Sequence, residues 1–122
     1  MITALWILNG ILAAVYLGAG GIKLVRTKEQ LRTSGQGWTD DFSQGAIRGI
    51  GTAELLGAIG LILPLATGIA PILTPLAAVG LAADMVGAVM VHRRRGDPFI
   101  VPAVLAVLAA ASAVLGFMHV LG

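Results

Sequence analysis

The chain of 122 residues has no cysteine, little charge and few aromatic side chains. The lack of cysteine excludes disulfide bonds, thiolate-ligated zinc, iron–sulfur clusters and covalently attached c-type haem. Charged residues make up 11% of the chain, roughly half the share of about 25% found in soluble domains. Hydrophobic residues make up 57%, and a soluble domain this small could not hide that much apolar surface. The composition therefore indicates an integral membrane protein.

Four apolar stretches are each long enough to cross a bilayer, which takes about 20 residues of helix. They cover residues 2–25, 45–66, 70–91 and 98–121. Segments of alternating polarity, which transmembrane β-strands require, are missing from the sequence. The sequence therefore predicts an all-α fold, a single membrane domain over residues 1–122 that is built as a bundle of four transmembrane helices.

Local signals mark the predicted ends of these helices. Pro64 and Gly68 indicate a short turn between the second and third spans, so these two helices should be antiparallel neighbours. Asp97 directly before Pro98 predicts a capping carboxylate at the start of the fourth span.

Basic residues are confined to two places along the chain. The eight are Lys23, Arg26, Lys28, Arg32, Arg48, Arg93, Arg94 and Arg95. They lie at or in the connections between spans one and two and between spans three and four. Because positive residues mark the cytoplasmic side, we expect the loops 26–44 and 93–97 to be cytoplasmic. Both termini should then lie outside, and the membrane should be a bacterial cytoplasmic (inner) membrane. Nothing in this charge pattern indicates nucleic-acid binding.

The loop 26–44 is the longest segment outside the predicted spans. Trp38 and Phe42 are spaced i, i+4 within it, so a short interfacial helix could point both rings at the lipid headgroups. An ordinary tethering loop with aromatic anchors is the simpler interpretation.

Two acidic residues lie inside the predicted spans, where an ionisable side chain costs about 2.5–3.5 kcal/mol on insertion scales. Glu54 lies in the second span and Asp84 in the third. Together with Tyr16 of the first span, they lie about 12–14 Å deep from the same side, counted at the helical rise per residue. A shallower layer completes the candidate cluster, which consists of Tyr16, Lys23, Arg48, Glu54, Asp84 and His92.

Helical spacing places several polar groups on common faces. Asn9, Tyr16 and Lys23 are seven residues apart and form one stripe, while Asp84 and His92 share a ridge. Small residues also recur at intervals of four, which predicts close helix packing within the bundle or, on an outer face, a homo-oligomer. These ridges are Gly10, Ala14 and Gly18 in the first span and Gly45, Gly49, Ala53 and Gly57 in the second.

Two interpretations of the polar cluster remain open. In the structural one, Glu54 and Asp84 pair with Arg48 and Lys23 and fix the register of the helices. In the functional one, the cluster lines a cavity for a polar headgroup, a quinone or a proton. The two histidines, His92 and His119, lie at opposite ends of their spans and so cannot hold one haem iron within a protomer.

Several segments together resemble a known family. They are Gly20-Gly21-Ile22-Lys23-Leu24, the stretch Glu54–Pro64, Thr67–Pro71, Leu73–Ala78, and Gly87-Ala88 followed by His92-Arg93-Arg94. In this order they resemble the DoxX-like family of small four-helix membrane proteins, over nearly the whole chain. Lys23, Glu54 and His92 match the polar positions of the family's segments.

The resemblance implies a fold and a range of functions. Relatives include membrane subunits linked to quinone reduction, anchors of redox-defence assemblies in actinobacteria, and animal proteins that assist receptor assembly. Our leading hypothesis is an accessory or anchoring subunit of a redox-related membrane assembly that binds a quinone or lipid in an intramembrane polar pocket. The chain carries no catalytic or metal-binding motif, so we favour a role other than that of an enzyme. The only cofactor that the hypothesis includes is a quinone.

Two further hypotheses belong to other classes of protein. One is a proton-coupled transporter of the short four-span type, although such transporters carry their essential glutamate in the first span and lack a strong charge bias. The other is a redox enzyme in its own right, which the lack of a cofactor motif disfavours.

Overall fold

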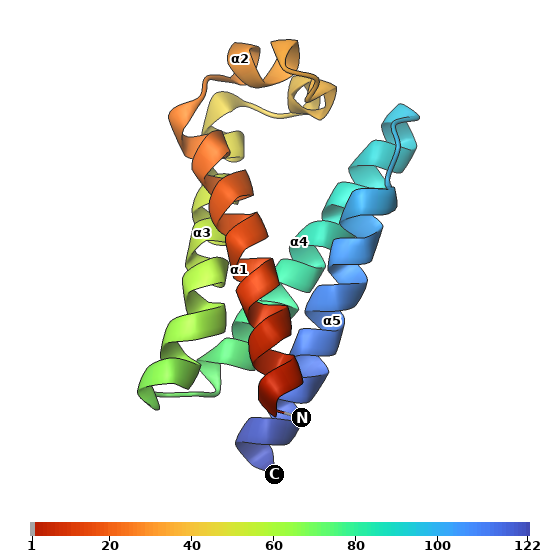
Figure 1. The fold of residues 1–122 in the computed structure, drawn as a ribbon. Coiled ribbons are helices and arrows are strands. Elements are labelled where there is room, and N and C mark those ends of the chain that lie inside the picture. The colour runs from red at the N-terminus through yellow and green to blue at the C-terminus, as the bar shows by residue number, and fades with distance from the viewer. Residues whose placement is uncertain (1) are drawn as a thin grey trace.

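The computed structural model describes residues 2–122, and these form four long helices with two short helical segments between the first two (Figure 1). The elements are α1 (Ile2–Val25), α2 (Lys28–Thr33), η1 (Gly37–Asp41), α3 (Gln44–Thr67), α4 (Leu73–Arg95) and α5 (Ile100–Leu121). Each long helix is long and apolar enough to span a membrane. The all-α bundle of four spans is confirmed, and the chain is an integral membrane protein.

The third and fourth spans differ from the prediction at their ends. The third span was expected over 70–91, but α4 starts at Leu73 and continues to Arg95, where Gly96 ends it in the left-handed conformation with φ of 76°. The arginines at this end favour helix, because positive side chains stabilise the carboxyl end of the helix dipole. The cap expected from Asp97 was wrong: its carboxylate accepts a hydrogen bond from Arg95 Nε at 3.0 Å, and α5 begins without a side-chain cap.

The helices form a ring in which α1 contacts α3 and α5, and α4 contacts α3 and α5. Figure 1 shows that the α1/α3 pair and the α4/α5 pair diverge toward the end that carries α2. We call this end, with the α1–α3 and α4–α5 connections, the loop half. The terminal half carries both termini and the turn between α3 and α4.

Two glycines allow α1 and α3 to approach closely. A Cβ atom on Gly20 would lie 2.7 Å from the carbonyl oxygen of Gly51, and one on Gly51 would lie 2.8 Å from that of Gly20. Lys23 and Glu54 each follow these glycines by three residues, on the next turn of their helices. The close backbone approach therefore brings these two side chains to one level.

The small-residue ridges expected to pack inside the bundle do so only in part: Gly57 of α3 packs closely against Leu81 of α4, while other members face outward. Gly10 and Gly18 are exposed on α1 and Gly49 is exposed on α3, and a Cβ atom on any of them would meet nothing within 4 Å. Spacing by four identifies a ridge but not the direction in which it points. The close contact of α1 with α3 lies on another face, at Gly20 and Gly51.

Buried polar groups in the terminal half satisfy one another. Asn9 donates to the carbonyl oxygen of Leu61 at 3.0 Å, and Ser112 donates to the side-chain oxygen of Asn9. Thr74 donates to the carbonyl oxygen of Gly60 at 2.8 Å. These bonds join α1, α3, α4 and α5 into one packed unit.

Candidate functional site

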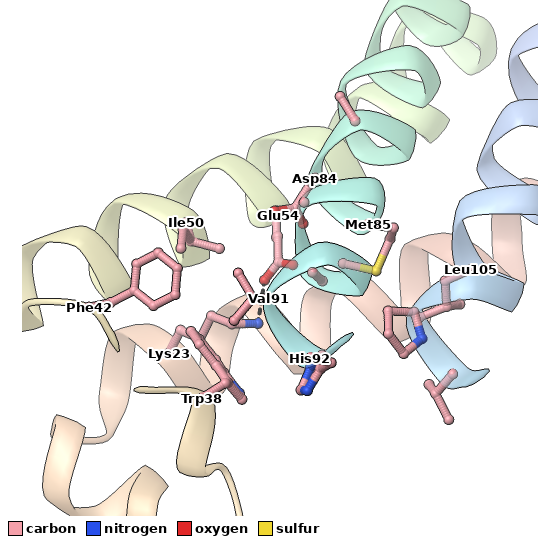
Figure 2. A pocket seen from close by; sticks show the side chains of 15 residues that line it. Lys23, Trp38, Phe42, Ile50, Glu54, Asp84, Met85, Val91, His92 and Leu105 are labelled. Atoms are coloured by element: carbon pink, nitrogen blue, oxygen red, sulfur yellow. Dashed lines mark hydrogen bonds and ion pairs between the residues drawn. The ribbon is translucent and has the colours of Figure 1, made fainter. Parts of the chain in front are cut away.

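A cavity of about 360 Å³ lies in the loop half of the bundle, a volume within the range of small-molecule sites, about 300–1,000 Å³. All four long helices and the α1–α3 connection contribute to its lining (Figure 2). Its polar or aromatic lining residues are Lys23, Trp38, Phe42, Glu54, Asp84 and His92. The remaining walls are apolar, with Ile50 from α3, Met85 from α4 and Leu105 from α5 among them.

Lys23 and Glu54 form the central ion pair of the cavity. Lys23 Nζ lies 2.6 Å from Glu54 Oε1, and the two side chains are only 11% and 2% exposed. The pair joins α1 to α3 one helical turn beyond the close approach of Gly20 and Gly51. Lys23 Nζ also lies 5.6 Å from the centre of the Trp38 ring, within range of a cation–π interaction.

Asp84 lines the same cavity from α4 but has no charged partner among the residues described. Figure 2 shows its side chain beside that of Glu54. Its Oδ2 atom is buried and makes no hydrogen bond within residues 2–122. The cavity thus holds two adjoining acids and one base, and the base is paired with Glu54.

Tyr16 lies within electrostatic range of Asp84 and Glu54 but outside the cavity lining, whereas Arg48 lies apart from the predicted cluster. Tyr16 is 1% exposed and packs in the core, and its hydroxyl group has no hydrogen-bond partner among the described residues. Arg48 is exposed on α3, lies outside the cavity lining, and forms no ion pair with any described residue. The structure therefore brings Lys23, Glu54, Asp84 and His92 together and leaves Arg48 outside.

His92 lies at the loop end of α4, where it contributes to the cavity wall. Its Nδ1 atom is 3.7 Å from Asp97 Oδ2, too long for a hydrogen bond but within range of an ion pair when the ring is protonated. Among residues 2–122, no three histidine, aspartate or glutamate side chains converge on a common point as a metal site would require.

Trp38 and Phe42 are site residues that the sequence reasoning assigned elsewhere. They were expected to anchor a loop at the lipid headgroups, but both line the cavity. Their rings pack edge to face, with centres 5.7 Å apart and planes at 72°. The sequence signal for these two residues was their i, i+4 spacing in a loop bounded by charges. Such spacing identifies an amphipathic segment but does not show what its apolar face packs against.

The segment of residues 28–42, here called the strap, carries these two rings across the loop half. Asp41 at the end of η1 binds Arg95 at 3.2 Å and lies 3.9 Å from Arg94, both at the end of α4. Arg95 binds Asp97 as well. The strap is thus joined to α3 by the chain and to α4 by ion pairs.

The sequence was compared with known families, curated proteins and solved structures. A model of the DoxX-like family matches residues 7–114, which is most of the chain and includes every polar residue of the cavity. No curated protein and no solved structure matches the sequence significantly. The family match, together with four helices that can span a membrane, establishes that the chain belongs to the DoxX-like family.

Proposed function

We propose that this protein binds a small amphipathic molecule of the bilayer, a quinone or a lipid, with its polar headgroup in the cavity of the loop half. The observation that carries the proposal is the pair of neighbouring acids Glu54 and Asp84 beside a single base in a cavity with apolar walls, where Asp84 Oδ2 is buried and no described residue donates a hydrogen bond to it. An unpaired ionisable group at membrane depth is costly. A ligand that hydrogen-bonds to it would remove that cost.

The composition of the cavity favours a quinone headgroup. Lys23 supplies donors, Glu54 supplies acceptors, and Asp84 can do either according to its protonation. Trp38 and Phe42 offer flat apolar surfaces suited to a ring. The carbonyl groups of a quinone accept hydrogen bonds and the hydroxyl groups of its reduced form donate them, so the two forms would use this set differently.

The role we propose is that of an accessory or anchoring subunit in a redox-related membrane assembly. The support is the family of the chain together with a ligand cavity that has no motif for a second, tightly held cofactor. We place the loop half on the cytoplasmic side of a bacterial inner membrane, because all eight basic residues lie in that half or just beyond it. A protein partner would then meet the strap and the exposed arginines.

The transporter alternative receives less support from the geometry. A glutamate that exchanges protons with drugs must be free to release its proton to water and substrate in turn. Glu54 instead lies 2.6 Å from Lys23 Nζ and is buried. Asp84 could still serve such exchange, and a liposome assay of proton-driven cation uptake would detect it.

The proposal can be tested by titrating the protein in lipid nanodiscs with a benzoquinone that has no side chain. Trp38 provides the signal once the second tryptophan, Trp6, is replaced in a Trp6→Phe background. We expect saturable quenching of Trp38, and Asp84→Leu should weaken binding about tenfold, as expected when a hydrogen bond with a charged group is lost. Arg48→Leu, outside the cavity, should bind like the parent protein.

Linear quenching without saturation, with no effect of Asp84→Leu, would refute a quinone site. Mass spectrometry of the purified protein separates the two ligand classes. A lipid ligand would appear as one phospholipid species enriched over the membrane extract, and its enrichment would be lost in Asp84→Leu.

A further inference from the structure

A second cavity of about 550 Å³ lies between α3 and α4 alone. It extends from the level of Glu54 toward the turn that joins the two helices. Its lining is apolar apart from two residues and includes Leu56, Gly57, Gly60, Leu63, Leu76 and Gly80. The two ionisable residues are Glu54 and Asp84, which also line the cavity of the loop half.

The two cavities therefore meet at the pair of acids. The cavity of the loop half lies on one side of Glu54 and Asp84, beneath the strap, and the second lies on the other side. The side chains of these acids lie beside one another across α3 and α4 (Figure 2). The acids therefore form a wall that both cavities share.

The second cavity is a groove that opens to the surroundings of the bundle. Leu56 and Leu63 on α3 and Leu76 on α4 are 64%, 52% and 49% exposed along it. From Glu54 to Pro64 it spans ten residues of helix, about 15 Å, or half of a hydrocarbon core about 30 Å thick. In a bilayer these exposed leucines would contact acyl chains.

We infer that this groove, which rests on the function proposed above, holds the hydrocarbon tail of the same ligand whose headgroup occupies the loop-half cavity. A tailed headgroup seated at Asp84 must direct its tail along some path. The strap end is charged, with Asp41 bound to Arg95, whereas the groove continues from the acids between apolar walls. The ligand is thus an amphiphile with a single chain, which reaches its site sideways from the bilayer between α3 and α4.

The groove discriminates between ligands by the space that it offers to a tail, not by its affinity for the tail. Lipid chains are as apolar as leucine, so a tail gains little free energy by moving from the bilayer onto an apolar helix face. Blocking the groove would therefore exclude tailed ligands by steric conflict and leave tailless ones unaffected. A comparison of tailed and tailless ligands therefore tests the groove independently of the headgroup site.

Gly80→Leu blocks the groove with little effect on packing. Gly80 is exposed and lines the groove, and a Cβ atom there would meet nothing within 4 Å. Gly10→Leu is the matched control, because Gly10 is equally open but lies on α1 outside both cavities. Ala53→Leu narrows the groove from α3 and provides a second, independent variant.

The experiment titrates each variant, in nanodiscs and with the Trp38 signal, with a benzoquinone and with its decyl derivative. We expect Gly80→Leu and Ala53→Leu to weaken binding of the decyl form about tenfold, the order of the penalty for overpacking a filled site. The tailless form should bind all variants alike, and Gly10→Leu should match the parent protein for both.

Equal binding of the decyl form to all variants would overturn the tail groove and leave the headgroup site intact. Equal weakening of both forms by Gly80→Leu would also overturn it, since the substitution would then act on the headgroup. Failure of the parent protein to bind either quinone would overturn the quinone site of the proposed function, and the groove for its tail with it.

Discussion

The terminal half and the loop half of the bundle treat buried polar groups differently. In the terminal half, the side chains of Asn9, Ser112 and Thr74 each form a hydrogen bond with a neighbouring helix. In the loop half, Lys23 and Glu54 are paired, while Asp84 Oδ2 has no partner among the described residues. Helix contacts in the terminal half are completed by hydrogen bonds of neutral side chains, whereas those in the loop half include a buried ion pair and an acid that lines a cavity. This difference is the basis for our proposal that the loop half binds a ligand.

The terminal half also shows how a helix defect is repaired. Pro64 lies inside α3 and has no N–H group, so the carbonyl oxygen of Gly60, four residues earlier, loses its helical donor. Thr74 of α4 supplies the missing hydrogen bond. No described residue supplies a comparable hydrogen bond to Asp84 Oδ2 in the loop half, so the two halves should respond differently to substitution.

Removal of the ion pair should have the largest effect on stability. Lys23→Met leaves Glu54 buried without its partner, and we expect a loss of about 3 kcal/mol in the free energy of unfolding. Lys23→Met/Glu54→Leu, which removes both charges, should recover most of that loss. Unfolding in a detergent series measures each value, with Arg48→Met as the exposed control. A double variant no more stable than the single one would show that packing, not charge, explains the loss.

A methyl group added where α1 and α3 cross should have the next largest effect on the free energy of unfolding. In Gly51→Ala the new Cβ would lie 2.7 Å from Lys23 Cβ and 2.8 Å from the carbonyl oxygen of Gly20. We expect a loss of about 2 kcal/mol from overpacking, with a disturbed ion pair on the next turn. Gly49→Ala, where the added atom meets nothing within 4 Å, is the matched control on the same helix. Similar values for the two alanine variants would contradict the observed close approach.

Loss of the hydrogen bond from Thr74 that compensates for Pro64 should have a smaller effect on the free energy of unfolding. Thr74→Val preserves shape but leaves the carbonyl oxygen of Gly60 without a donor, and we expect a loss of about 1 kcal/mol in the free energy of unfolding. Pro64→Ala restores the backbone donor, so Thr74→Val should cost much less in that background. A double-mutant cycle measures this coupling. Additive losses would mean that the hydroxyl group does not serve the defect left by Pro64.

The sequence predicted the spans and the depth of the polar groups because both follow from helical rise and hydropathy. The stripe of Asn9, Tyr16 and Lys23 is buried as helical periodicity requires, with all three residues at most 9% exposed. Arg48 shows where this reasoning stops. It lies six residues from Glu54, on another face of α3, and the rotation of α3 is fixed by its contact with α1 at Gly51.

The strap could not be placed from the sequence for a related reason. Trp38 and Phe42 lie in a segment whose helical pieces are too short for periodicity to define a buried face. Their position over the cavity depends on contacts made far away in the chain, above all between Asp41 and Arg95. Such long-range ion pairs leave no pattern in local spacing. The site was therefore predicted where it lies within helices and missed where it lies in the connection.

The ion pairs of the strap should have the smallest effect on stability and a clear effect on access to the cavity. Asp41→Asn removes the partner of Arg94 and Arg95, and exposed ion pairs contribute little to the free energy of unfolding. In the Trp6→Phe background, Trp38 should become more accessible to acrylamide, because the strap loses its attachment to α4. High salt should increase quenching of the parent protein in the same direction, since salt screens exposed charges.

Asp40, the acid next to Asp41, provides the control for the quenching experiment with Asp41→Asn. Asp40 pairs at 3.6 Å with Arg32, which belongs to the strap itself, so Asp40→Asn removes an equal charge without detaching the strap from α4. It should leave Trp38 quenching unchanged. If both variants raised quenching equally, the charge of the strap rather than its link to α4 would control access. If neither did, the contact of Trp38 with Lys23 of α1 would be sufficient to hold the strap over the cavity.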